Sequence, residues 1–140
     1  MGSASVIEAD RVLVDWQVFA SLRAELGPNF VRILGYFRED GETSVSRIEE
    51  AMNRRDAAAL VLPAHTMKSE ARQFGAEPLA VLAEEIEHSA RRGIEGRFFP
   101  DEILPQVARL RPLYRDTLEL LEREANPLVA RRAAGFGRRA

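Results

Sequence analysis

The sequence contains no cysteine, which excludes disulfide bridges, thiolate nucleophiles and thiolate-bound zinc. It has no apolar run approaching the roughly 18–20 residues of a membrane-spanning helix, and its amino terminus lacks the basic start and apolar stretch of a signal peptide. It also has no excess of positive charge, because 20 basic and 22 acidic residues give a net charge of −2. These absences favour a cytoplasmic protein that binds neither membranes nor nucleic acids.

What the sequence has instead is a helical repeat of apolar residues along most of its length. A first stripe, ended by Gly27, consists of Val12, Trp16, Phe19, Ala20, Arg23 and Leu26. A second stripe, over about 28–53, consists of Phe30, Ile33, Leu34, Phe37, Gly41, Val45, Ile48 and Met52. Residues 39–41 could break the second helix in two, but the unbroken phase of its apolar residues favours a single long helix.

A third helix is expected from an N-cap at Asp56 to about Gly75. Pro63 falls in the middle of this stretch, where proline removes one backbone hydrogen bond and can kink a helix. The alternative is therefore a regular helix that begins only at Pro63.

Two further helices complete the pattern. The fourth is predicted to close at residues 91–93, before a loop over 94–99, and the fifth opens at Pro100. Amphipathic helices joined by short loops bury their apolar faces against one another. We therefore predict an all-α fold, an antiparallel four-helix bundle with an additional short N-terminal helix, in a single domain over 1–125. The basic residues 126–140 are expected to form a mobile tail.

His65, one of two histidines in the chain, lies on the outward face of the third helix. At about 100° per residue, Lys68, Ser69 and Arg72 share that face, and the apolar residues of the helix lie on the opposite side. A neutral imidazole offers a nucleophilic nitrogen, two cations can offset the charge of a phosphoryl group, and a small serine lets a partner approach. These residues alone leave two interpretations open, an inert surface histidine and a phosphoryl carrier.

The sequence around His65 resembles the signature of histidine-containing phosphotransfer (HPt) domains. The residues that carry the resemblance are His65-Thr66-Met67-Lys68-Ser69-Glu70-Ala71, followed by Phe74-Gly75-Ala76 and Leu79. Flanking positions that agree with the family pattern are Leu34, Phe37, Ile48, Ala51, Asp56 and Leu60 upstream, and Leu82, Ile86 and Glu87 downstream. The resemblance extends over roughly residues 15–92.

The resemblance implies a protein that carries a phosphoryl group on His65 between aspartates of receiver domains in a two-component phosphorelay. It implies no ATP-dependent kinase activity and no cofactor of its own, because the receiver supplies Mg²⁺ and the acidic pocket. In the family pattern Lys68 stabilises the phosphoryl group and Gly75 is a structural position. The implied partners are receiver domains of response regulators and hybrid histidine kinases. They are expected to dock on a monomer and to cover Val61, Leu62, Ser69 and Arg72.

The chain departs from the family pattern at two positions. Ser69 stands where glycine is usual, and Glu70 stands where a small residue is usual. Ser69 still leaves a small side chain, and Glu70 is expected to pair or to be solvated at the flank of the bundle. Both departures concern the fit of a partner rather than the phosphoryl chemistry.

Other classes of function were weighed against the same residues. One is a non-catalytic helical adaptor that docks on a signalling partner through the same face. Another is the dimerisation domain of a histidine kinase, whose motif has an acidic residue directly after the histidine and a proline shortly afterwards. Here Thr66 follows His65, and the first proline after His65 is Pro78. Glu85 and His88 have the spacing of half a di-iron motif, but no second half exists, so no metal site is predicted.

Overall fold

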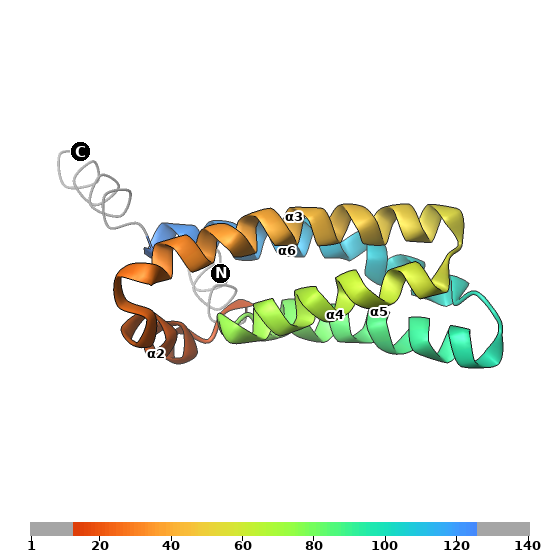
Figure 1. The fold of residues 1–140 in the computed structure, drawn as a ribbon, viewed down its shortest axis with the longest axis horizontal. Helices are drawn as coiled ribbons and strands as arrows, with labels where there is room; N and C mark the ends of the chain where they lie inside the picture. Colours follow the sequence, from red (N-terminus) through yellow and green to blue (C-terminus); the bar gives the residue numbers. More distant parts are fainter. Residues whose placement is uncertain (1–12, 126–140) are drawn as a thin grey trace, which may run out of the picture.

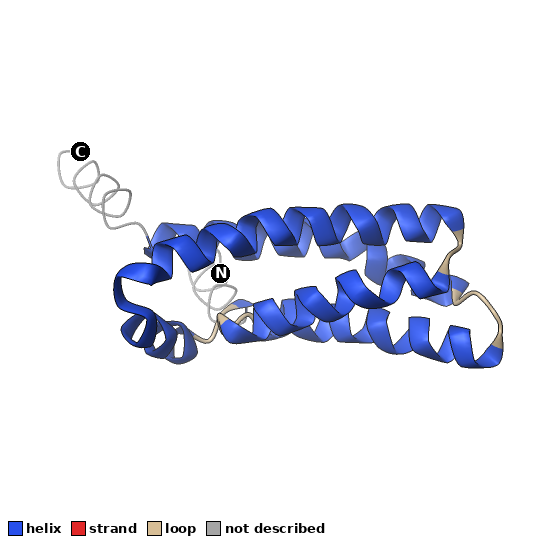
Figure 2. Ribbon diagram, in the orientation of Figure 1, coloured by secondary structure: helices blue, strands red, loops and turns tan. Residues whose placement is uncertain are grey.

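The computed structural model of the chain describes residues 13–125, and every regular element in that range is a helix (Figure 2). In chain order the elements are α2 (Trp16–Leu26), η1 (Gly27–Asn29), α3 (Phe30–Arg54), α4 (Ala57–Gln73), α5 (Glu77–Gly96), η2 (Asp101–Ile103) and α6 (Leu104–Ala125). In Figure 1 α3 lies beside α6 and α4 lies beside α5, with α2 at one end of the molecule. The predicted all-α fold, an antiparallel four-helix bundle with a short N-terminal helix, is confirmed.

A chain of packed aromatic rings runs through the core. Neighbouring ring centroids are between 5.1 and 5.9 Å apart along the series Phe19, Phe30, Phe74, Phe37 and Tyr114. These rings come from α2, α3, the end of α4 and α6, and all five are buried. Three of the four ring pairs are edge-to-face and the pair of Phe37 and Phe74 is tilted, and such aromatic pairs add to the stabilisation that apolar burial provides. One face of α4 therefore packs against the core, and this packing fixes which face of the helix points outward.

Aspartate caps begin two of the helices. Asp15 accepts hydrogen bonds from the backbone N–H groups of residues 17 and 18 at the start of α2, and Asp56 accepts one from the N–H of Ala59 in α4. Such caps satisfy donors that the first helical turn leaves unpaired. The predicted cap at Asp56 is confirmed. The alternative in which the regular helix begins at Pro63 is wrong, because α4 runs through this buried proline without interruption.

The end of α5 differs from the prediction. Residues 94–96, predicted to form a loop, are helical, and α5 ends at Gly96 with Arg97 as its cap, in a left-handed conformation with φ 56°. Gly93 does not terminate the helix. It lies where the returning chain passes close by, and a Cβ at this position would be 2.7 Å from the Phe98 carbonyl oxygen. Gly93 is therefore needed for close packing and not for ending the helix.

The buried strip of α2 is narrower than its predicted stripe. Phe19 and Leu22 are the buried residues of the helix, whereas Ala20 is exposed. The other predicted positions in this helix, Trp16, Arg23 and Leu26, are half-buried, and Val12 lies outside the described residues. This short helix lies at one end of the molecule (Figure 1), where it contacts the bundle through α3 and α4. The expected tail over 126–140 also lies outside the described residues.

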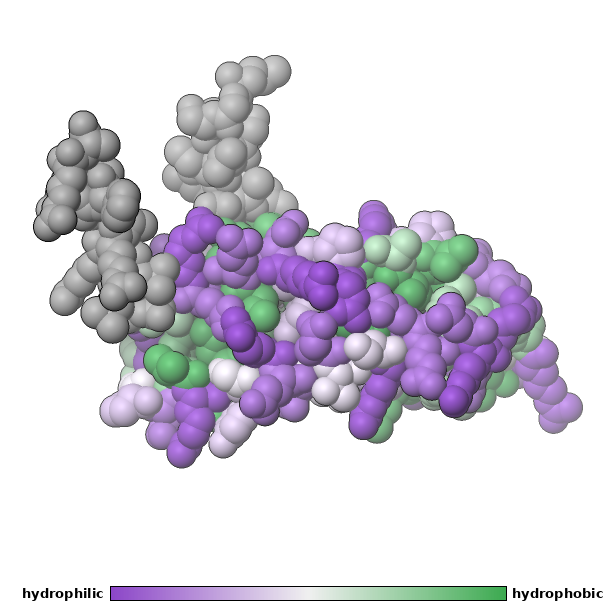
Figure 3. Space-filling model, turned by 90° about the horizontal axis from the view of Figure 1, so that it is seen from above, coloured by the Kyte–Doolittle hydropathy of each residue, from purple (hydrophilic) through white to green (hydrophobic). Residues whose placement is uncertain are grey.

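The outward faces of the helices are mostly polar. Figure 3 shows the molecule from above, with hydrophilic residues over most of the described surface and separate apolar patches between them. Within residues 13–125, none of the helices combines the length and the apolar character that crossing a bilayer requires.

Gly41 gives a test of how tightly α3 and α6 pack. A Cβ at this position would lie 2.3 Å from the ring of Tyr114, which is fully buried and donates a hydrogen bond to the Arg38 carbonyl oxygen. Gly41→Ala is expected to lower the free energy of unfolding by about 2 kcal/mol, because the ring cannot move without losing its packing. Gly35→Ala is the matched control. Nothing lies within 4 Å of a Cβ there, so this change is expected to stabilise α3 by about 0.5–1 kcal/mol. Equal free energies of unfolding for the two variants in urea would contradict the close contact between Gly41 and the ring of Tyr114.

Candidate functional site

His65 lies on the surface of the bundle, in the middle of α4. Its side chain is 50% exposed, whereas Ala64 and Met67 on the other side of the helix are buried against the core. The predicted outward orientation of His65 is therefore present in the structure. A ring in this position is held by its helix and remains open to a partner.

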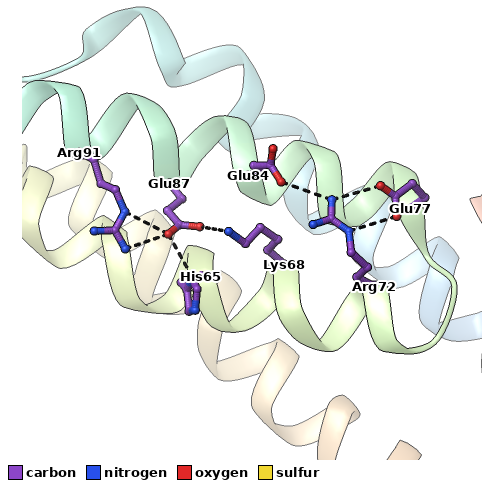
Figure 4. A network of polar contacts seen from close by, with 7 residues as sticks. All are labelled: His65, Lys68, Arg72, Glu77, Glu84, Glu87 and Arg91. Atoms are coloured by element: carbon purple, nitrogen blue, oxygen red, sulfur yellow. Dashed lines mark hydrogen bonds and ion pairs between the residues drawn. The ribbon is translucent and has the colours of Figure 1, made fainter.

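A single buried carboxylate organises the surroundings of His65. Glu87 projects from α5, with its side chain only 7% exposed, and its Oε2 atom lies 3.0 Å from Nδ1 of His65. Lys68 Nζ lies 2.8 Å from Oε1 of the same carboxylate, as an ion pair rather than a well-aligned hydrogen bond. Arg91 donates two hydrogen bonds to Oε2, from Nε at 3.1 Å and from a terminal nitrogen at 2.9 Å. Figure 4 shows these four residues, which we call the His65 cluster.

The charges of the cluster determine which nitrogen of the His65 ring carries the proton and which keeps its lone pair. Burial by itself would raise the pKa of Glu87, but the contacts with Lys68, Arg91 and His65 outweigh burial and hold that pKa at about 2. The carboxylate is therefore ionised at neutral pH and can only accept hydrogen bonds. It follows that Nδ1 of His65 carries a proton and donates a hydrogen bond to Glu87. In the neutral ring this leaves the lone pair on Nε2, the nitrogen that does not face the carboxylate.

Arg72 does not join the His65 cluster. The sequence places it on the same face as His65, as a second cation for a phosphoryl group. In the structure it makes a bidentate pair with Glu77, at 3.1 and 3.2 Å, and a further contact with Glu84 at 3.3 Å. Both acidic residues belong to α5 (Figure 4). The cations that reach the carboxylate beside His65 are instead Lys68 and Arg91.

The other residues expected at a docking surface surround the histidine on α4. Leu62 is strongly exposed, at 66%, one helical turn before His65. Val61 is half-buried and packs against the core, and Ser69 is exposed. Together with His65 they form an outward face that is apolar on the N-terminal side of the ring and polar on the other.

Gly75 fixes the end of α4 against α2. Its φ of 84° lies in the left-handed region, which favours glycine, and its carbonyl oxygen accepts a hydrogen bond of 2.8 Å from the Asp15 backbone N–H. A Cβ at this position would lie 2.6 Å from the Asp15 carbonyl oxygen. Both the backbone conformation and the close approach therefore require glycine.

Sequence reasoning did not include Glu87 and Arg91 among the site residues. A signal for Glu87 existed, because it falls inside the apolar stripe of α5 between the buried residues Ala83, Ile86 and Ala90. A charged residue in such a stripe needs a partner from another helix. Arg91 follows four residues later, the spacing at which two side chains of a helix meet.

Glu70, which departs from the family pattern, lies against Asp40 of α3 rather than near the imidazole. Burial, followed by the charge and hydrogen bond of Asp40, raises the pKa of Glu70 to about 7. The folded protein therefore binds more protons than the unfolded chain between about pH 4.5 and 7, and its stability falls as the pH rises through this window.

Because the pKa of Glu70 is raised beside Asp40, the stability of the folded protein is expected to depend on pH. Glu70→Gln removes the ionisation, so the variant is expected to be more stable than the wild type at pH 8 by about 1 kcal/mol, with little difference near pH 4. Asp40→Asn should have a smaller effect in the same direction, because it removes the neighbouring charge but leaves Glu70 buried, and burial is the largest cause of its raised pKa. Thermal unfolding between pH 4 and 8 measures the difference. Parallel curves for the wild type and both variants would show that the pKa of Glu70 is not raised in the folded protein.

The described residues contain no group of three or more histidine, cysteine, aspartate or glutamate side chains that could hold a metal ion. His88, the histidine of the half motif considered above, is exposed on α5.

Comparison with known proteins gives two matches. The family profile of the Hpt domain matches residues 32–124 of this chain. The crystal structure of histidine-containing phosphotransfer protein B (HptB) from Pseudomonas aeruginosa PAO1 is similar, with a TM-score of 0.70 and 28% sequence identity over 80% of this chain and 93% of that one. A search of curated protein sequences finds no match. The range matched by the profile includes α4 and α5, and with them every residue of the His65 cluster.

Proposed function

The chain belongs to the Hpt domain family, and we propose that His65 is the residue on which it carries a phosphoryl group. As a member of this family it is a histidine phosphotransfer protein of a phosphorelay. The observation that supports His65 most directly is the contact of its Nδ1 with the buried carboxylate of Glu87, which leaves Nε2 open to a donor.

The chemistry proposed for His65 is a direct transfer between aspartate and imidazole. The Nε2 lone pair attacks the phosphorus of an aspartyl phosphate, the N–P bond forms, and the bond from phosphorus to the aspartate oxygen breaks, with its electron pair leaving on the carboxylate. No proton has to be removed, because Nδ1 keeps its own. The ring becomes positively charged as the bond forms, and Glu87 faces the proton on Nδ1, so the carboxylate stabilises that charge. The reverse transfer uses the same contacts.

Lys68 is proposed to stabilise the phosphoryl group. It follows His65 by one helical turn, and its ammonium already lies beside the imidazole because both contact Glu87. The side chain is 21% exposed, and a lysine on a four-carbon stem can redirect its charge over a short distance. When a phosphoryl group is on Nε2, the ammonium would move from Oε1 toward it.

Hpt proteins act with the receiver domains of response regulators, and for this chain we propose receivers of response regulators and of hybrid histidine kinases. The receiver would supply Mg²⁺, and it would cover the face formed by Val61, Leu62, Ser69 and Arg72. The exposed Leu62 beside the ring supports an apolar contact there. A monomer is sufficient in this proposal, because all residues of the His65 cluster come from one chain. A cytoplasmic location stays a prediction from the sequence.

The proposed function is tested by a transfer profile. The purified protein is mixed with each receiver domain of the same genome after that receiver has been phosphorylated, and the products are measured by intact-mass spectrometry. At least one receiver is expected to transfer its phosphoryl group within minutes and to yield a product that is labile in acid and stable in base. If no receiver labels the protein, the proposed function is wrong.

A further inference from the structure

We propose that Arg91 is a positioning residue for phosphoryl transfer, which keeps Glu87 paired when Lys68 leaves that carboxylate for the phosphoryl group. This inference rests on the proposed function of His65. It concerns a residue of α5 that lies outside the signature around the histidine.

The arrangement of charges around Glu87 motivates the proposal. One carboxylate, 7% exposed, faces two cations: Lys68 at Oε1 and Arg91 at Oε2. A single cation would neutralise it, so the second is in excess in the resting state. Arg91 shares Oε2 with Nδ1 of His65, and its two hydrogen bonds hold that oxygen in line with the ring.

Transfer changes this balance. The phosphoryl group on Nε2 is an anion, and Lys68 is the cation on the same helix that can reach it. If Lys68 moved and no second cation were present, a nearly buried carboxylate would be left with only the charge that develops on the His65 ring during attack, which is unfavourable before that charge has formed. Arg91 removes that penalty, because it stays on Oε2 while Lys68 moves. The carboxylate then also keeps its position against Nδ1.

A purely structural role for Arg91 would look different. Arg91 is 56% exposed and follows the nearly buried Glu87 by four residues in the same helix, and Lys68 still pairs with this carboxylate in the resting protein when Arg91 is removed, so the loss of Arg91 should cost little stability. The pair formed by Arg54 and Glu50 has the same spacing, but both of its side chains are exposed and it lies at the end of α3, on a helix that carries none of the cluster residues. Arg54→Ala is therefore a control for the loss of an arginine–glutamate pair of this spacing away from His65.

The test measures the rate at which His65 becomes phosphorylated by two donors. One is the phosphorylated receiver identified in the transfer profile. The other is phosphoramidate, a small donor whose P–N bond breaks and releases ammonia as the bond to Nε2 forms, so that no docking surface is involved. Arg91→Ala is expected to be about tenfold slower with both donors, Arg91→Lys close to the wild type, and Arg54→Ala unchanged. Melting temperatures of the three variants should agree with that of the wild type.

A double substitution separates action through Glu87 from direct action on the phosphoryl group. In Glu87→Gln there is no carboxylate to neutralise, so adding Arg91→Ala is expected to cause no further loss of rate. The inference is overturned if Arg91→Ala is as fast as the wild type, or if it costs the same tenfold in the Glu87→Gln background. A wild-type protein that no donor phosphorylates overturns the proposed function itself, which is a distinct result.

Discussion

Replacement of His65 by glutamine is expected to abolish phosphoryl acceptance and to leave the bundle folded. The ring is half-exposed, so little core packing is lost, and the amide nitrogen of glutamine can still donate to the Glu87 carboxylate. Glutamine has no nucleophilic nitrogen, however, and the transfer step has no other acceptor in the cluster. Intact-mass spectrometry after incubation with a phosphorylated receiver should show only unmodified protein.

The second histidine gives the matched control for this experiment. His88 is exposed on α5, and His88→Gln should accept a phosphoryl group as fast as the wild type. The circular dichroism spectra of both variants should match the helical spectrum of the wild type. Phosphorylation that survives in His65→Gln, or that disappears in His88→Gln, would show that the wrong histidine has been assigned.

Glu87 is expected to have the second largest effect. In Glu87→Ala the ring loses the acceptor that fixes its tautomer and the charge that stabilises it during attack. A hydrogen bond to a charged group is typically worth about 2 kcal/mol, so transfer is expected to slow by about 30-fold. Glu87→Gln keeps an oxygen that can accept from Nδ1 and loses only the charge, so its loss should be smaller, about fivefold.

Both Glu87 variants are measured as initial rates of labelling, together with thermal unfolding. Lys68 and Arg91 can reach water from their positions, so the loss of the carboxylate should leave the fold intact. Equal rates for Glu87→Ala and the wild type would mean that Glu87 stabilises the resting protein and has no part in transfer. A larger loss in the glutamine variant than in the alanine variant would contradict the role of the hydrogen bond.

Most of the helical architecture could be predicted because it depends on local patterns. Apolar residues at helical spacing identified the long α3 across Gly41, and the cap at Asp56 identified the start of α4. The end of α5 could not be predicted in this way. Gly93 has the appearance of a terminator in the sequence, and only the path of the chain near Phe98 shows why a glycine is needed inside the helix.

The sequence predicted the part of the candidate site that lies on α4. The spacing of His65 and Lys68 placed both on the outward side of α4, and the structure brings both to one carboxylate. Which residues α5 places beside His65 depends on how α5 is aligned with α4. This alignment cannot be predicted from the apolar pattern of either helix by itself. For that reason Glu87 and Arg91 were missed. Arg72 was assigned to the histidine for the same reason, although α5 supplies it with two acidic partners.

The identity of the nitrogen that carries the phosphoryl group is the most direct test of whether Glu87 orients His65 for transfer. The protein is labelled with ¹⁵N in its histidine rings, phosphorylated by a receiver, and examined by NMR for coupling between phosphorus and the ring nitrogens. The contact between Nδ1 and Glu87 predicts a phosphoryl group on Nε2 of His65, with the proton still on Nδ1. A phosphoryl group on Nδ1, or on any other residue, would contradict the central claim that Glu87 orients His65 for transfer.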